Sequence, residues 1–474
     1  MLFSSAIFLF LFLPLFLVAY YLIPNRGAVV SATQTGFRAI NWPNALLFGA
    51  SLLFYAWGEG PIVAVLLLSA GINFVAGGLI ERGNRKAGLY LSLIGSLALL
   101  FYFKYTNFFF ETIDQPIARI ALPIGISFYT FQGISYTLDV YWGRIRANRS
   151  FLDFGTYVAM FPHQIAGPIV RYADIAPELA DRRVTLTKFG TGAERFIIGM
   201  AKKILIANTF AHIADLIFDA PTASITPGAA WLGAVAYSFQ IYFDFSGYSD
   251  MAIGLGKMVG FDFKENFNYP YVSRSIQDFW RRWHISLSSW FRDYLYIPLG
   301  GNRLGEAKTY RNLLIVFAVT GFWHGASWNF IVWGLYHGLF LMVERAGLGK
   351  QLDRAPASLT HAYTLLVVLV GWVFFRAADL SSAVVFLQKM AGFGPATTGP
   401  MAYSLPYFLT PEIGLTLVLG VLFSMPVYHR FQKLVNVQHG FPAVAYSVGL
   451  FGLFVLSVMY LAADTYNPFI YFRF

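Results

Sequence analysis

The sequence predicts an all-α polytopic membrane protein, and its composition and patterning support this. Of the 474 residues, 57% are hydrophobic and only 12% are charged, whereas soluble domains carry about 25% charged residues. The hydrophobic residues also form long blocks of the length that a bilayer-spanning helix needs. Composition alone therefore favours a membrane protein over a soluble one.

About eleven segments approach or exceed the roughly 17–25 mostly apolar residues of a membrane span. In chain order they cover residues 3–23, 44–58, 61–80, 88–110, 117–142, 193–218, 229–256, 311–345, 360–376, 411–429 and 442–464. The first segment lacks the basic n-region and the cleavage site of a signal peptide, so we expect it to be a retained membrane helix.

Two stretches depart from this pattern. Residues 150–170 are apolar but contain Pro162, Gly167 and Pro168. This predicts a re-entrant segment, because irregular backbone at membrane depth is tolerated only where protein or a cavity surrounds it. Residues 274–296 are rich in aromatic and basic side chains, which predicts an amphipathic helix at the cytoplasmic interface.

The spacing within the interfacial segment supports a helix. Trp280, His284, Leu287 and Phe291 would share one stripe of a helix over 274–296. Asp278 and Arg282 would stand at the i, i+4 spacing that stabilises a helix.

Loop charges predict an orientation for the first half of the chain. Basic residues mark alternate loops: Arg26 and Arg38, then Arg82, Arg85 and Lys86, then Arg144, Arg146 and Arg149. The loops between them carry acidic residues, so the positive-inside rule places the N-terminus outside the cytoplasm. The net charge of +10 fits these basic loops. Nucleic-acid binding is the poorer interpretation, because the basic residues are scattered through short loops.

Several chemistries lack support. The chain has no cysteine, which excludes disulfides, thiolate metal sites and a cysteine nucleophile of its own. It also lacks the G-x-x-x-x-G-K-[ST], H-E-x-x-H and G-x-S-x-G motifs of common ATPases, metalloproteases and serine hydrolases. We predict no metal site.

His324 stands out because it lies deep in an expected span, where a polar group is costly. Histidine can stay neutral there and keep the ability to accept a proton. Gly321 and Gly325 beside it would let a substrate approach the imidazole. Alternatively, these glycines, with Gly334 and Gly338, pack helices together, and His324 only bonds to a neighbouring helix.

Other polar residues in apolar surroundings have weaker support. His284 taken alone is more typical of a satisfied core or interfacial histidine. His163, in the broken stretch, could line a cavity. Asp244 and Asp250 read as buried acids, for which an ion pair is the usual explanation and a proton relay the alternative.

At these residues the chain resembles a known family. The stretch RSIQDFWRRWHISLSSWFRDYLYIPLGGNR and the later TGFWHGASWNFIVWGLYHG resemble the membrane-bound O-acyltransferase (MBOAT) family. Four further stretches resemble the bacterial alginate O-acetyltransferase branch of this family: MLFSSAIFLFLFLPLFL, YFDFSGYSDMAIG, MFPHQIAGPIVRY and NPFIYFRF. The resemblance runs nearly end to end.

The resemblance implies a ring of tilted membrane helices, with re-entrant and interfacial helices, around a central tunnel. We expect one such domain over 1–474, with N-terminal helices at 1–142, a catalytic core at 143–345 and C-terminal helices at 346–474. The family's two signature positions carry over to His284, on the cytoplasmic side, and His324, deep in the tunnel. His324 would be the general base, and His284 would polarise the thioester carbonyl, orient the donor or hold a proton.

The expected substrate contacts are broader. They are Trp283, Trp323, Asn329, Arg281, Arg282, Arg303, His163 and Asp244. The three arginines could meet CoA phosphates or an acidic carrier protein, although anchoring at the membrane surface is an alternative for each. We expect no bound cofactor, and acetyl-CoA or another acyl thioester as the donor substrate.

The function implied is O-acetylation of an exopolysaccharide, with acetyl taken from a cytoplasmic thioester. The family relationship implies the bacterial inner membrane and a periplasmic or membrane-anchored partner resembling SGNH esterases. D-alanyl transfer from a carrier-protein thioester to teichoic acid is the nearest alternative. A polysaccharide-precursor transporter is an alternative of another class, although no inverted repeat supports it. A structural scaffold of a secretion complex is the third.

Overall fold

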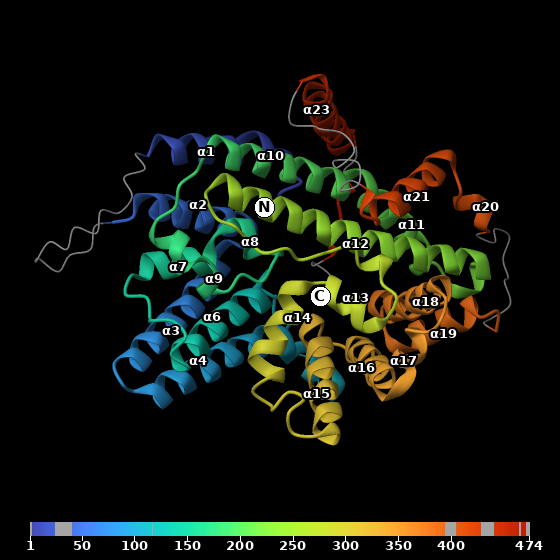
Figure 1. Cartoon of the computed structure of the whole chain (residues 1–474), viewed down its shortest axis with the longest axis horizontal. Coiled ribbons are helices and arrows are strands. Elements are labelled where there is room, and N and C mark those ends of the chain that lie inside the picture. The colour runs from blue at the N-terminus through green and yellow to red at the C-terminus, as the bar shows by residue number, and fades with distance from the viewer. Residues whose placement is uncertain are drawn as a thin grey trace, which may run out of the picture. The chain divides into compact units, whose positions relative to one another are not determined.

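The computed structural model describes residues 2–23, 40–115, 117–393, 404–427, 440–463 and 466–470. Its regular elements in these ranges are helices (Figure 1), which confirms the all-α class. Arg26 and Arg38, used above to orient the chain, lie outside the described residues.

Five helical segments of the described chain are long and apolar enough to span a membrane: 42–81, 85–112, 186–218, 357–376 and 440–463. Many of their large side chains face outward, among them Ile94, which is 67% exposed, and Phe451, which is 68% exposed. Such contiguous apolar surface is unfavourable in water but suits lipid chains. The chain is therefore a multi-pass membrane protein, and the total of about eleven spans remains a prediction.

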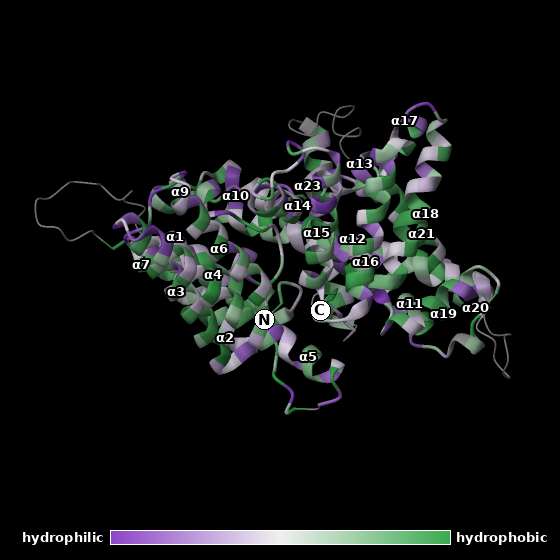
Figure 2. Ribbon diagram, turned by 90° about the horizontal axis from the view of Figure 1, so that it is seen from below, coloured by the Kyte–Doolittle hydropathy of each residue, from purple (hydrophilic) through white to green (hydrophobic). Residues whose placement is uncertain are grey.

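The helices group into two compact units. The first comprises residues 1–196 and 248–264. Its helices are α1 (Leu13–Leu22), α2 (Trp42–Glu59), α3 (Val63–Glu81), α4 (Arg85–Leu100), α5 (Thr106–Thr112), α6 (Ile126–Tyr141), α7 (Phe151–Ala159), α8 (Phe161–Gln164) and α9 (Tyr172–Ala180). Hydrophobic positions dominate ribbons such as α2 (Figure 2).

A buried polar network joins α3, α4 and α6 of this unit. The Asn73 amide donates to Ser96, and its oxygen accepts from Ser92 and Thr137. A Cβ at Gly133 would lie 2.3 Å from the Asn73 amide nitrogen. Only glycine therefore leaves room for the network, which holds these helices together where the hydrophobic effect between spans is weak.

The predicted interruption within 150–170 is confirmed. The chain forms α7, breaks at Met160, forms the four-residue α8 and then leaves the helix. Residues 153–170 are all buried within the first unit, so protein surrounds this irregular backbone as its position requires.

The second unit comprises residues 197–247 and 265–474. Its helices are α11 (Asn208–Phe218), α13 (Ile276–Arg282), α14 (Ile285–Phe291), α15 (Glu306–His324), α16 (Trp328–Val343), α17 (Gly349–Leu352), α18 (Ala357–Arg376), α19 (Leu380–Met390), α20 (Leu405–Phe408), α21 (Pro411–Phe423) and α23 (Gly440–Ala463). Helices α10 (Leu186–Ala201) and α12 (Pro227–Met258) contribute residues to both units. The single domain with boundaries at 142 and 345 stays a prediction.

The prediction of one continuous helix over 274–296 is wrong. The segment forms α13, breaks at Trp283 and His284, forms α14 and ends in a π-helical turn over Arg292–Tyr296. His284 causes the break because its backbone adopts the left-handed conformation, with φ +44° and ψ +55°, which a helix cannot continue through. The expected stripe is nevertheless buried, and Asp278 pairs with Arg282 at 2.9 Å.

The prediction of one span over 311–345 is also wrong. Helix α15 ends at His324, and α16 starts at Trp328 and packs beside α15 (Figure 1). A Cβ at Gly321 would lie 2.2 Å from the Phe330 carbonyl oxygen, and one at Gly334 would lie 2.2 Å from that of Phe317. The glycines serve helix packing, and the interpretation that they open access to His324 is wrong.

Candidate active site

His284 is held in place by one buried side chain, Asn266. The His284 Nδ1 atom lies 3.0 Å from Asn266 Oδ1, and the same oxygen accepts from the backbone N–H of Ser286 at 3.2 Å and from its hydroxyl at 2.8 Å. The Asn266 carbonyl also accepts from the N–H of Ile285. Asn266 thus fixes both the start of α14 and the plane of the His284 ring.

These contacts determine the tautomer of His284. A backbone N–H can only donate, so the Asn266 atom that faces Ser286 N is the amide oxygen. That oxygen has no proton to give, so His284 Nδ1 must carry the proton of the bond. In the neutral ring Nε2 therefore keeps its lone pair. The Nε2 atom is buried and has no hydrogen-bond partner within the described part of the chain.

The charge state of His284 follows from its burial. The side chain is fully buried and lies outside the five apolar segments long enough to span a membrane. Removal from water disfavours the charged ring and lowers the pKa of His284 to about 3. The imidazole is therefore neutral near pH 7.

His324 ends α15 close to His284. The two ring centres are 6.4 Å apart. The Trp323 ring lies beside both, with its centre 4.9 Å from that of the His324 ring and 6.3 Å from that of the His284 ring. Trp333 and Phe375 contact His324 with their rings at 5.1 and 5.3 Å. His324 is buried, with 7% of its surface exposed, and its depth in the membrane stays a prediction.

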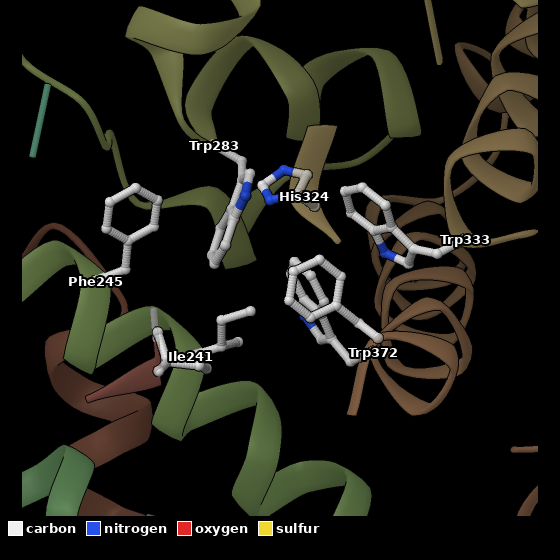
Figure 3. A pocket seen from close by; sticks show the side chains of 8 residues that line it. Ile241, Phe245, Trp283, His324, Trp333 and Trp372 are labelled. Carbon is white, nitrogen blue, oxygen red and sulfur yellow. The ribbon is translucent and has the colours of Figure 1, made fainter. Parts of the chain in front are cut away.

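A narrow apolar cavity lies against His324 within the second unit (Figure 3). Its lining residues are Ile241, Phe245, Trp283, His324, Trp333, Trp372, Phe375 and Ile470. The centre of a water molecule can occupy about 10 Å³ of it, which is the space for about one water.

Glu344 anchors α13, the helix that directly precedes Trp283. Its carboxylate accepts from the backbone N–H groups of Ile276 at 2.6 Å and Gln277 at 3.0 Å, the first two residues of α13. The Tyr363 hydroxyl also donates to it, at 3.2 Å. Glu344 is buried and caps the N-terminus of α13.

Asp244 forms the ion pair expected of a buried acid. Its carboxylate lies 2.9 Å from the Lys203 ammonium, and both side chains are 2% exposed. Its second oxygen accepts from the N–H of Ile470 at 2.8 Å, which holds that residue at the cavity wall. Asp250 pairs with Arg195 at 2.6 Å in the first unit.

Of the remaining predicted substrate-contact residues, some lie at the cavity or the imidazoles and others do not. Trp283 lines the cavity, and Trp323 contacts both imidazoles. Asn329 does not line it: its amide donates to the carbonyls of Phe374 and Ala377 and so ties α16 to the end of α18.

Four of the predicted substrate-contact residues are polar and lie away from the cavity. Arg281 and Arg303 are exposed, and Arg282 is engaged by Asp278. His163 is buried in the first unit, where its Nδ1 lies 2.9 Å from the Gln132 amide. None of these residues is among those lining the cavity.

Sequence reasoning missed Asn266 and most of the aromatic wall. Asn266 is eighteen positions before His284, so no helical periodicity connects the two. Trp372 and Phe375 lie in another expected span, where aromatic residues are common. Within the described ranges, no cluster of three or more His, Cys, Asp and Glu residues could hold a metal ion. The arrangement suits proton transfer between neutral imidazoles and a reacting group in an apolar setting.

The comparisons with known proteins identify the family. The model of the membrane-bound O-acyltransferase family matches residues 130–350, which include both histidines. A probable alginate O-acetylase AlgI from Azotobacter vinelandii is 42% identical over the whole of both chains. The chain belongs to the membrane-bound O-acyltransferase family. It is an O-acyltransferase.

The names of more distant relatives give other acceptors of the acyl group. A peptidoglycan O-acetyltransferase from Helicobacter pylori is 36% identical over 90% of this chain and 87% of its own length. A teichoic acid D-alanyltransferase from Bacillus subtilis is 27% identical over 70% of this chain and 86% of its own length. The alginate O-acetylase branch of this O-acyltransferase family is thus the more similar one.

Proposed function

We propose that this O-acyltransferase takes acetyl from cytoplasmic acetyl-CoA and passes it across the bacterial inner membrane for O-acetylation of an exopolysaccharide. The observation that carries the proposal is the 42% identity, over both full lengths, to a probable alginate O-acetylase. The small cavity at His324 supports acetyl over larger acyl groups. The acceptor is the polysaccharide hydroxyl itself or a hydroxyl of a periplasmic or membrane-anchored SGNH-type partner.

The chemistry needs one base and a closed site. The acceptor hydroxyl attacks the thioester carbonyl, His324 takes the hydroxyl proton, the C–S bond breaks as the ester forms, and the imidazolium gives its proton to the departing thiolate. General-base help of this kind contributes about 10²–10⁴-fold. Positioning two substrates against one another contributes further.

The geometry favours one of the three roles considered for His284. With Nδ1–H bonded to Asn266, the neutral ring presents a lone pair at Nε2. A lone pair can accept a proton or orient a donor group, but it cannot polarise a thioester carbonyl, which needs a hydrogen-bond donor. Because burial also disfavours the charged ring, we assign His284 the role of orienting the donor.

Transfer of labelled acetyl tests the proposal. Purified wild type and His324→Ala would be compared with radiolabelled acetyl-CoA, a candidate partner and the polysaccharide. His212→Ala, at an exposed histidine of the same unit, is the matched control. We expect label on partner or polysaccharide with wild type and the control only.

Two outcomes contradict the proposal. Equal transfer by His324→Ala would remove His324 from the chemistry. Transfer of D-alanine from a charged carrier protein, with none of acetyl from acetyl-CoA, would favour the teichoic acid alternative.

A further inference from the structure

An open cleft in the first unit has no part in the proposed reaction. Its volume is about 340 Å³, and it lies between α3, α7, α9 and the loop 142–150. The residues that line it are Glu81, Arg146, Ala147, Asn148, Arg149, Asp153, Tyr172, Ala176, Leu179 and Ala180.

The cleft lies at the level of a membrane surface. The loop 82–86 joins two segments that are long and apolar enough to span, 42–81 and 85–112. The loop 142–150 is held at the same level, because the N–H of Ala147 donates to Glu81 and the Arg85 guanidinium donates to the Tyr141 carbonyl. Lipid headgroups occupy this depth of a bilayer.

The two loops carry a strong positive charge. They contain six basic and no acidic residues, namely Arg82, Arg85, Lys86, Arg144, Arg146 and Arg149. Arg144 is engaged, because it pairs with Asp139 at 3.1 Å and covers the Trp142 ring at 4.4 Å. Arg146 and Arg149 are exposed, line the cleft and have no ion-pair or hydrogen-bond partner within the described residues.

Each of the two carboxylates that line the cleft is engaged by another hydrogen-bond donor. Glu81 accepts from the N–H of Ala147 at 3.3 Å. Asp153 is only 7% exposed and accepts from the Asn44 amide at 2.6 Å. The guanidinium groups of Arg146 and Arg149 therefore remain available to an external anion.

We propose that this cleft binds the phosphate of an anionic phospholipid headgroup, such as that of phosphatidylglycerol. Two guanidinium groups at one cleft can each donate two parallel hydrogen bonds to phosphate oxygens. Basic pockets beside spanning helices on the cytoplasmic side are suited to such headgroups. The bound lipid would link the loop 142–150 to α3 and α9 and is separate from the acyl-transfer site.

Native mass spectrometry of the full chain, released from detergent with added phosphatidylglycerol, tests the site. Phosphatidylcholine is the zwitterionic comparison. The variant Arg146→Gln/Arg149→Gln removes the two free arginines. The control Arg144→Gln/Arg354→Gln also removes two positive charges. Arg144 is already paired with Asp139, and Arg354 is exposed in the second unit.

We expect the cleft variant to bind phosphatidylglycerol about 30-fold more weakly, from two basic residues each contributing near an anionic headgroup. The control should keep the wild-type affinity, and phosphatidylcholine should bind weakly to all. Equal affinity of the cleft variant and wild type overturns the proposal. Displacement of the lipid by an equal concentration of inorganic phosphate also overturns it, since the site would then select free phosphate.

Discussion

His284 and Asn266 form a buried pair in which the Nδ1 atom of the histidine lies 3.0 Å from the Oδ1 atom of the asparagine, with neither side chain more than 1% exposed. The pair resembles the orienting contacts that hold catalytic histidines in other enzymes, where the partner fixes the tautomer and the ring plane. Here it leaves the lone pair of the neutral ring on Nε2.

Substitution at Asn266 tests this relationship. In Asn266→Ala the proton on Nδ1 loses its acceptor and Ser286 loses two bonds, so we expect kcat to fall about 100-fold. Asn266→Asp keeps the acceptor oxygen and should lose less. The measurement is acetyl transfer at saturating donor, with thermal unfolding in detergent to confirm that both variants are folded. An equal loss in both folded variants would contradict the tautomer argument.

Removing one partner of the Lys203–Asp244 ion pair should destabilise the protein more than removing both. In Lys203→Met the Asp244 carboxylate is left buried without its partner, which costs about 3–5 kcal/mol. The double variant Lys203→Met/Asp244→Leu removes both charges and should recover part of the loss. Thermal unfolding followed by fluorescence measures the difference. If the double variant were as unstable as the sum of the two single variants, the charges would not be coupled.

Helix packing between α15 and α16 should tolerate no side chain at Gly321. In Gly321→Ala the new Cβ would meet the Phe330 carbonyl, so the helices must separate, at a cost of about 1–3 kcal/mol. Gly449→Ala is the matched control on α23, since no atom lies within 4 Å of a Cβ there. It should be neutral or stabilising, because alanine favours helix more than glycine does. Similar unfolding temperatures for the two variants would contradict the packing assignment.

The cavity wall should set acyl length. Phe375→Leu shortens a wall residue whose ring lies 5.3 Å from that of His324. We expect the ratio of kcat/KM for butyryl-CoA to that for acetyl-CoA to rise about tenfold, the scale on which apolar pockets discriminate methylene groups. Phe340→Leu, on α16 outside the cavity, should leave the ratio unchanged. No change of the ratio in Phe375→Leu would show that the cavity does not select the acyl group.

The sequence by itself determined that this protein is an all-α, multi-pass membrane protein, because the length and apolarity of a span are local properties. It also singled out His324, since a polar group at membrane depth is costly, and its motifs indicated the O-acyltransferase family. The i, i+4 pair of Asp278 and Arg282 was predictable for the same reason, because its spacing is set within one helical segment.

Only the tertiary structure decided where the helices break and what surrounds the two histidines. Asn266 holds the His284 side chain at the break and Glu344 caps the start of α13, and both come from elsewhere in the chain. Trp372, Phe375 and Ile470 reach the cavity from the C-terminal part of the chain. Contacts over such sequence separations follow no helical period, so one sequence does not reveal them, whereas packing of the folded chain does.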